Sequence, residues 1–595
     1  MKSASRIVFV ILLLVIARPV SATIRYRISL KNPEQHFFRV SMEIPVNESD
    51  RDIIVAIPVW NALYQVRDFA YRVYNVRATN SSSPSDFLSI QKLDKQTWKV
   101  SLSAGSPSHS AIVTYEIAWN DPGPFNSQLD ADHAFVNFAE VLMYLPNKRA
   151  EDTSVEFDDV PSGWHVAAEL PGTPDSNSFS AASYDALVDA PAELGAFDEF
   201  AFDEAGAHFR VVVTGKGWRS DRLETDFHRI VNYEIGMMSG PPFRAYTFFI
   251  NLGTYQEVGG GGMEHSNCTA ISAPSVESAA TIAAHEFFHA WNVKRIRPQT
   301  LEPVDFTREM YTRALWFAEG VTSTYGAYTL ERTGLWDKNQ FYGDLAEQIS
   351  ELDSRPAHTW QSVEESSLDA WLEKYDDYRQ PDRSISYYNK GQLVGVLLDL
   401  AIRDATDNHK SLDDVMRRMN DVYAKQGRFY DDSNAVQAIA EEIAGVKFDD
   451  FFRRYIAGTD DIPYQDFFHA AGLDLKIETV KAAEVGFWTI GHGPGMPVVV
   501  SQVAPGTSAE AAGLKSGDTV VAINGQAVAR NLQAWARDRS PGEKIRVTVR
   551  RDDKNVDVTF PLGRIDSRKF SVVETSSATE KEHRIREGWL KGTTN

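Results

Sequence analysis

Cysteine is almost absent from this chain, because Cys268 is the only one among its 595 residues. A single thiol excludes any intrachain disulfide, even in a compartment where disulfides could form. We expect Cys268 to be a buried, inert thiol, and a metal ligand is the alternative.

Long hydrophobic runs are also scarce. The exception is Ile7–Ile16, which follows the basic residues Lys2 and Arg6 and precedes the small-residue sequence Val20-Ser21-Ala22. This run is too short to span a bilayer comfortably, so residues 1–22 are predicted to be a cleaved signal peptide rather than a membrane anchor. We therefore expect an exported protein, periplasmic or secreted, with no membrane insertion after cleavage.

Basic residues are outnumbered. The chain has 61 Lys and Arg against 82 Asp and Glu, for a net charge of −21. This balance argues against nucleic acid and anionic membranes as partners, and it identifies no substrate.

The length predicts several domains, since one hydrophobic core rarely serves more than about 250–300 residues. Alternating segments such as Ile24–Leu30 and Phe38–Ile44 predict strands, whereas segments such as Gln340–Leu352 and Gly391–Ala405 predict helices. The predicted fold class is multidomain α+β. The predicted order is a signal peptide (1–22), a largely antiparallel N-terminal β domain (23–218), a mostly helical domain (219–473), a second β domain (474–565) and a polar tail with a short helix (566–595).

The second β domain resembles a PDZ domain through Ala512–Gly525, in which Gly517-Asp518 forms a turn and Val520–Ile523 a strand. PDZ domains bind peptide C-termini by strand addition, so a peptide C-terminus is an expected partner. Gly486-Phe487 is the candidate carboxylate loop. A packing module or substrate gate without its own ligand is the alternative.

The motif H-E-x-x-H occurs at His285-Glu286-Phe287-Phe288-His289. On a helix, positions i and i+4 share one face, so the two imidazoles can bind one zinc ion. Glu286 lies one position round the helix and can reach water at the ion without ligating it. The segment 281–297 is predicted to be a buried helix that ends before Pro298, and a chance match on an amphipathic helix is the alternative.

A catalytic zinc ion needs a third protein ligand and an open position for water. A histidine six positions beyond His289 would indicate a metzincin, but Arg295 stands there and excludes that class. Glu319, inside an apolar aromatic run, is the best candidate, because a buried carboxylate needs a cation or hydrogen bonds. Glu302 and Glu309 are the competitors, each in a more polar setting.

A glycine-rich run, Gly259–Gly262, leads into Met263, Glu264 and His265. Its glycines permit a tight backbone beside an edge strand, where a peptide substrate can lie. Glu264 would then pair with a substrate α-ammonium, which separates an aminopeptidase from an endopeptidase. A flexible surface turn is the alternative. His265 is expected to support a neighbouring group or the fold, and a position near the metal is the alternative for it.

The sequence Ser386-Tyr-Tyr-Asn-Lys-Gly391 precedes a predicted apolar helix. A tyrosine hydroxyl can donate a hydrogen bond to the oxyanion of a tetrahedral intermediate. The residues alone leave open whether Tyr387 or Tyr388 does so, and the alternative for either is a packed aromatic ring.

Four elements occur in order: the glycine-rich Met-Glu loop, H-E-x-x-H, Trp-Phe-x-Glu-Gly and Tyr-x-Lys-Gly. With the PDZ-like unit, and with Ile57–Trp60 and Arg67–Phe69 in the N-terminal domain, they resemble the M61 family of glycyl aminopeptidases over most of the chain. The M1 family is a weaker match, since its loop carries asparagine where this chain has His265.

The M61 resemblance implies a thermolysin-like catalytic domain of the gluzincin class, with one zinc ion per chain. It implies peptide substrates with a free N-terminus and a small first residue, glycine and often alanine. The implied roles are metal binding by His285, His289 and Glu319, general base catalysis by Glu286, oxyanion stabilisation by Tyr388, and substrate binding by Glu264, Gly261, Gly262 and Met263.

Two other function classes fit the same residues. One is an exported zinc metallo-endopeptidase that recruits substrates through the PDZ-like unit. The other is a non-catalytic, chaperone-like peptide-binding protein with a relict metal site.

Overall fold

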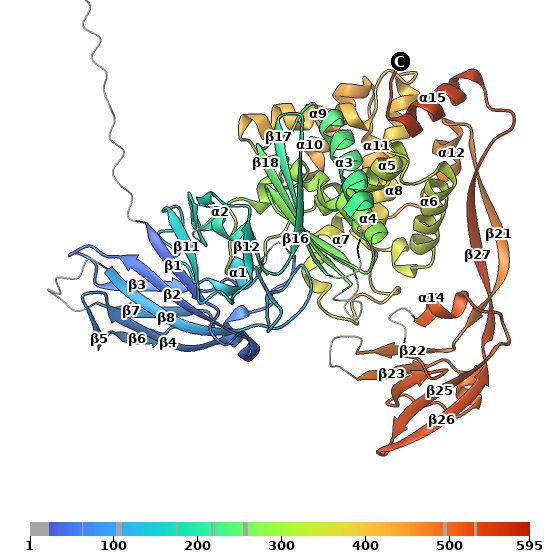
Figure 1. Cartoon of the computed structure of the whole chain (residues 1–595). Helices are drawn as coiled ribbons and strands as arrows, with labels where there is room; N and C mark the ends of the chain where they lie inside the picture. Colours follow the sequence, from blue (N-terminus) through green and yellow to red (C-terminus); the bar gives the residue numbers. More distant parts are fainter. Residues whose placement is uncertain are drawn as a thin grey trace, which may run out of the picture.

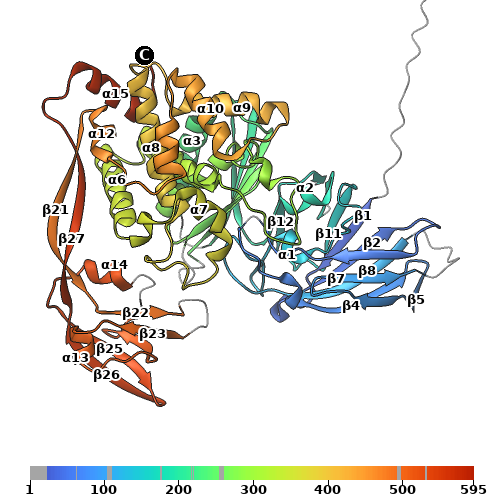
Figure 2. The same ribbon diagram turned by 180° about the vertical axis from the view of Figure 1, so that it is seen from behind.

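The computed structural model describes residues 23–61, 63–102, 110–173, 177–215, 218, 220–253, 260–491, 497–528 and 532–595. The predicted signal peptide and Gly259 lie outside the described residues. Figures 1 and 2 show an N-terminal β domain, a central helical domain, and a C-terminal β domain carried on a two-stranded ribbon. The predicted fold class is confirmed.

The N-terminal domain is built on a large sheet that is antiparallel except where β1 pairs with β11. Its strands, in sheet order, are β13 (Gly172–Thr173), β14 (Ser178–Ala181), β11 (Thr153–Asp158), β1 (Ile24–Ser29), β2 (Phe37–Pro45), β8 (Ser110–Ala118), β4 (Val73–Asn80) and β5 (Ser83–Phe87). Two smaller sheets are β3 (Asp52–Ala56), β7 (Thr97–Ser101) and β6 (Ser89–Lys92), and β12 (His165–Ala168), β15 (Ala192–Gly195), β10 (His133–Val136) and β9 (Gln128–Leu129). Short helices α1 (Phe138–Val141) and α2 (Tyr184–Val188) complete the domain.

The central domain contains a five-stranded sheet with β19 at one edge. Its strands, in sheet order, are β16 (Asp198–Glu204), β17 (Ala207–Gly215), β18 (Ala245–Leu252), β20 (Cys268–Ala273) and β19 (Gly261–Glu264). The predicted N-terminal domain, residues 23–218, includes β16 and β17. In the structure these two strands pair into the sheet of the central domain. Alternation shows that a strand forms but not which sheet it joins.

Helices cover one side of this sheet (Figure 1), and residues of the N-terminal domain pack on the other side. The main ones are α3 (Ser220–Met237), α4 (Val276–Glu286), α5 (Thr322–Arg332), α6 (Lys338–Asp353), α7 (Val363–Leu368), α8 (Tyr387–Ala405), α9 (Leu412–Val422), α10 (Asp432–Ala444), α11 (Asp449–Phe451) and α12 (Tyr464–His469). The helices predicted from residues 340 and 391 are confirmed as α6 and α8, the second beginning four residues earlier than predicted.

The C-terminal domain hangs from a ribbon made by β21 (Leu473–Glu484) and β27 (Gly563–Glu574). Its sheet contains β22 (Phe487–Ile490), β23 (Val498–Val503), β24 (Thr519–Ile523), β25 (Lys544–Arg551) and β26 (Lys554–Pro561), with helices α13 (Ser508–Ala511) and α14 (Leu532–Arg537). The ribbon then returns the chain to the central domain, where α15 (Glu580–Lys591) docks. The indole of Trp589 in α15 is buried and donates to the Tyr328 hydroxyl at 2.7 Å.

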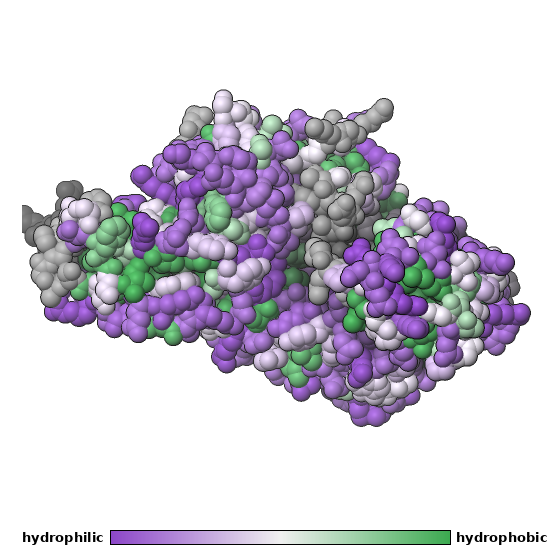
Figure 3. All heavy atoms as spheres, turned by 90° about the horizontal axis from the view of Figure 1, so that it is seen from below, coloured by the Kyte–Doolittle hydropathy of each residue, from purple (hydrophilic) through white to green (hydrophobic). Residues whose placement is uncertain are grey.

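Hydrophilic side chains cover most of the face seen in Figure 3, with smaller hydrophobic areas on the N-terminal and C-terminal domains. Within the described ranges, no helix combines the length and the apolar character that a membrane crossing requires.

Candidate metal centre and substrate cleft

His285 and His289 lie where α4 passes into a 3-10 turn, η3 (Phe288–Ala290). The backbone stays helical across this junction, so both imidazoles remain on one face. Their Nε2 atoms are 3.1 Å apart. The helix predicted over residues 281–297 was therefore too long, because helical structure ends with η3.

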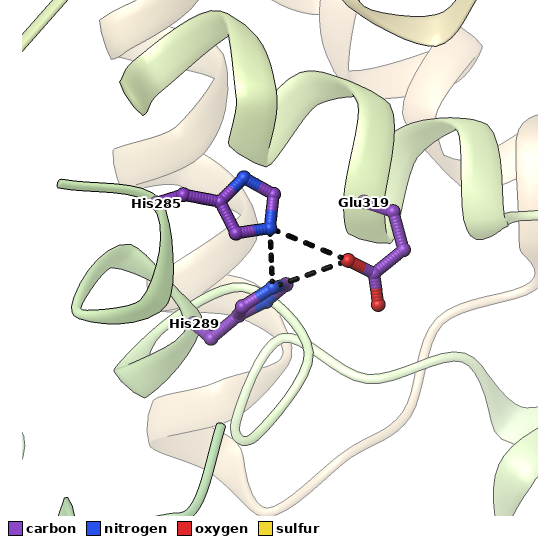
Figure 4. Close-up of side chains that lie close together, drawn as sticks. All are labelled: His285, His289 and Glu319. Atoms are coloured by element: carbon purple, nitrogen blue, oxygen red, sulfur yellow. Dashed lines mark hydrogen bonds and ion pairs between the residues drawn. The ribbon is translucent and has the colours of Figure 1, made fainter. Parts of the chain in front are cut away.

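Glu319 lies in a single π-helical stretch, η5 (Trp316–Val321), that leads into α5. Such π-turns often occur at functional sites. Its Oε2 atom is 3.2 Å from Nε2 of His289 and 3.6 Å from Nε2 of His285. Figure 4 shows the three side chains pointing toward one another. Two segments thirty residues apart in sequence thus converge on one point.

These three side chains form a group that could hold a metal ion. Tetrahedral ligands roughly 2.0–2.1 Å from one ion lie about 3.4 Å from each other, and the three pairs here are separated by 3.1–3.6 Å. The donor set therefore fits a small divalent cation. The competing Glu302 pairs with Arg297 instead. Neither Glu302 nor Glu309 joins the group among the described residues.

Asn292 links the two halves of this centre, a role that sequence reasoning missed. Its backbone carbonyl accepts a hydrogen bond from Nδ1 of His289 at 2.7 Å, which leaves Nε2 as the free lone-pair donor. Its side-chain amide donates to the Phe317 carbonyl at 2.8 Å, beside Glu319. The next residue, Val293, has φ of 125°, a conformation that a β-branched residue rarely adopts. No sequence pattern foretells that turn.

Asn292→Ala should weaken metal binding by about 10- to 100-fold, because it removes the bond that ties the His289 turn to the Glu319 helix. Zinc titration of the metal-free protein by calorimetry measures the change. Asn434→Ala, at an exposed position on α10, is the control and should bind zinc like the wild type. Equal affinities for all three proteins would contradict this role for Asn292.

Glu286 is 7% exposed and faces the strand that runs past the centre. Burial raises the pKa of its carboxyl to about 8. A Cβ atom on Gly262 would lie 2.3 Å from Cγ of Glu286, so only glycine fits there. Strand β19 therefore passes directly beside this carboxyl group.

Strand β19 is an edge strand held by the N-terminal domain. Asn137 and Asn61 both point their amides at the sulfur of Met263, at 3.4 and 4.0 Å. Gly261 packs against the Phe125 ring, which a Cβ would approach to 3.3 Å. The N-terminal domain therefore helps to hold this edge strand in place. The side chain of Glu264 makes no hydrogen bond or ion pair with the described residues and lines a cavity.

Two tyrosines begin α8. Tyr387 is buried at 3% exposure, whereas Tyr388 is 38% exposed, with its ring centre 6.1 Å from that of His285. Gly391 on α8 packs against Gly320 of η5 so closely that a Cβ on Gly320 would meet Cα of Gly391 at 2.4 Å. These two glycines let α8 and the Glu319 segment touch backbone to backbone.

His265 and Cys268 lie outside the metal group. Nδ1 of His265 is 3.3 Å from Asp189, which ties β19 to the N-terminal domain. Cys268 is fully buried on β20, and burial raises the pKa of its thiol. Cys268 is buried, as predicted, and neither residue joins the metal group among the described residues.

Known protein families match all three domains. The M61 N-terminal domain profile matches residues 25–196, the M61 glycyl aminopeptidase profile matches residues 278–394, and a PDZ profile matches residues 499–551. A curated relative, described as a probable periplasmic serine protease do/HhoA-like of Haemophilus influenzae, is 39% identical over 74 residues. That match covers 12% of this chain and only 16% of the relative.

Among solved structures, an aminopeptidase N family protein from Idiomarina loihiensis shares the fold, with a TM-score of 0.80 and 23% identity. The match covers 96% of this chain and 100% of that protein. An M1 zinc metallopeptidase from Deinococcus radiodurans matches with a TM-score of 0.46 and 14% identity, over 74% of this chain and 95% of that protein. The chain therefore belongs to the M61 peptidase family, with the N-terminal and catalytic domains of that family followed by a PDZ domain.

Proposed function

We propose that this peptidase is a zinc aminopeptidase that removes small N-terminal residues, glycine and alanine, from peptides. The observation that carries the proposal is the position of Glu264. Its carboxylate, which pairs with no other side chain among the described residues, stands on the edge strand that passes beside Glu286 and the His-His-Glu group. A carboxylate there suits the α-ammonium of a substrate whose first peptide bond lies at the metal.

One zinc ion per chain, held by His285, His289 and Glu319, is the proposed cofactor. Two imidazoles and one carboxylate are the donors of many catalytic zinc sites, and the donor separations support the assignment. A bound zinc ion supplies Lewis acidity, which polarises a peptide carbonyl and acidifies water.

The chain's own groups account for the remaining chemistry. Glu286 takes a proton from the attacking water and delivers it to the leaving amine, as a carboxyl group beside the edge strand and the His-His-Glu group can do. The Tyr388 hydroxyl donates to the developing oxyanion, and its exposure supports it over the buried Tyr387. Glu264 fixes the register by binding the N-terminus, while Gly261, Gly262 and Met263 offer the backbone of β19 to the peptide.

The test compares glycyl-alanyl-alanyl peptides with a free or an acetylated N-terminus. The wild type should cleave the first bond of the free peptide and should not cleave the acetylated peptide. Glu264→Gln should lower kcat/KM on the free peptide by about 10- to 100-fold, since a hydrogen bond between charged groups is lost. Glu199→Gln, at an exposed position on β16, should behave like the wild type. Equal cleavage of both peptides by the wild type would instead indicate an endopeptidase.

The PDZ domain supports a second, weaker proposal: binding of a peptide C-terminus along β22. This strand lies at the edge of its sheet and exposes Trp488 and Ile490. Gly486, with φ of 74°, precedes it.

Export is proposed from the N-terminal sequence alone. The periplasmic relative covers too little of the chain to add much.

A further inference from the structure

A loop of the N-terminal domain enters the hydrophobic core of the catalytic domain. The buried side chains of this loop belong to the hydrophobic core of the catalytic domain and not to the core of the N-terminal domain. They are Val59, Trp60 and Tyr64. The Trp60 indole donates to the Asp305 carbonyl at 2.7 Å, and its ring lies 5.2 Å from that of Trp371. The loop is therefore a fixed part of the catalytic domain's wall.

A cavity of about 300 Å³ lies at this domain junction, and Glu264 lines it. Its charged walls are largely neutralised, since Arg297 pairs with Glu302 and Lys294 with Asp189. Asp185, another lining residue, pairs with Arg149. The lining also has polar residues, Asn61, His265 and Ser266, and an apolar part made by Trp60, Ala139, Val188, Leu301, Val304 and Phe306. The apolar part can receive an uncharged, apolar side chain.

Tyr64 lines this cavity together with Glu264. Its ring lines the cavity, is 8% exposed and packs edge-on against Trp371 at 6.1 Å. Burial raises the pKa of Tyr64, and the carboxylates of Glu319 and Glu264 raise it further. The ring therefore shares this cavity with Glu264, the proposed amine site. Its hydroxyl makes no hydrogen bond with the described residues.

We propose that Tyr64 sets the size limit for the N-terminal side chain of the substrate. With the α-ammonium at Glu264 and the scissile carbonyl at the metal, that side chain projects towards the ring of Tyr64. A hydrogen or methyl group fits in front of the ring, whereas a larger side chain needs the volume behind it. This inference rests on the proposed aminopeptidase function and assigns its specificity to a residue of the N-terminal domain.

Tyr64→Ala should enlarge the cavity beside Glu264 and admit apolar side chains. The measurement is the ratio of kcat/KM for the leucyl p-nitroanilide to kcat/KM for the glycyl p-nitroanilide. We expect this ratio to rise by about 10- to 200-fold, the range by which an apolar pocket discriminates side chains. Tyr64→Phe keeps the ring and should keep the wild-type ratio. Retained glycyl activity shows that each variant is folded, and Tyr64→Leu serves as the test if Tyr64→Ala does not fold.

An unchanged ratio in Tyr64→Ala, or the same increase in Tyr64→Phe, would overturn the inference. So would a wild type that cleaves leucyl and glycyl substrates equally well. An acetyl-glycyl substrate in the same assay separates the two proposals. If blocked and free substrates are cleaved alike, the aminopeptidase function itself fails. If only free amines are cleaved and the ratio stays constant, the role of Tyr64 alone fails.

Discussion

Glu286→Gln is expected to lower kcat for a glycyl substrate by about 10²- to 10⁴-fold, the contribution typical of general acid–base catalysis. Glutamine has nearly the same shape as glutamate, so it fits beside Gly262, but it cannot accept and return a proton. Zinc content should stay at one ion per chain, since Glu286 is outside the His-His-Glu group. Steady-state kinetics measures kcat, and elemental analysis of the same sample measures the zinc content.

Glu193→Gln is the matched control for that variant. Glu193 is also a buried glutamate, on β15, and accepts a hydrogen bond from Thr214 at 2.9 Å. Its replacement should leave kcat within a few-fold of the wild type. If Glu286→Gln kept comparable activity, another group would have to be the base.

Glu319→Gln should remove the bound metal, and activity with it. The carboxylate supplies the only negative charge in the three-residue group, and its oxygen lies 3.2 Å from His289. Loss of a direct ligand should weaken zinc binding by more than the roughly 10- to 100-fold that loss of a ligand's supporting partner costs. Dialysis against a zinc buffer followed by elemental analysis measures the affinity.

Glu309→Gln controls for the loss of another carboxylate from the segment that precedes Glu319 in the sequence. Glu309 is outside the group, so this variant should keep both zinc and activity. Partial recovery of Glu319→Gln at high zinc would agree with a weakened site. Full zinc occupancy in Glu319→Gln at low zinc would show that Glu319 is not a ligand.

The local parts of the site could be predicted from the sequence. His285 and His289 are four residues apart, so a helix alone brings their rings together, and the structure has Nε2 atoms 3.1 Å apart. Glu319 could be singled out because a carboxylate in an apolar run needs a cation. The strands and helices that carry these motifs follow from period-2 and period-3.6 patterns.

The non-local parts could not be predicted in this way. Asn292 precedes a turn in which Val293 has a positive φ. Valine rarely adopts a positive φ, so the sequence gives no sign of this turn. Tyr64 belongs to the N-terminal part of the chain, yet it lines the cavity beside Glu264 and packs against Trp371, hundreds of residues away in the sequence. The pairing of β17 with β18 depends on tertiary contacts, as does the π-helical turn at Glu319. Close glycine contacts, such as Gly320 with Gly391, also become visible only in three dimensions.

The central claim is that a zinc centre in this chain removes single residues from free peptide N-termini. N-terminal profiling of a peptide library by mass spectrometry tests it most directly, with purified protein, with a chelator, and after zinc is restored. We predict loss of one small N-terminal residue, glycine or alanine, from unblocked peptides, abolished by the chelator and recovered with zinc. Cleavage at internal bonds, or activity that persists without metal, would contradict the claim.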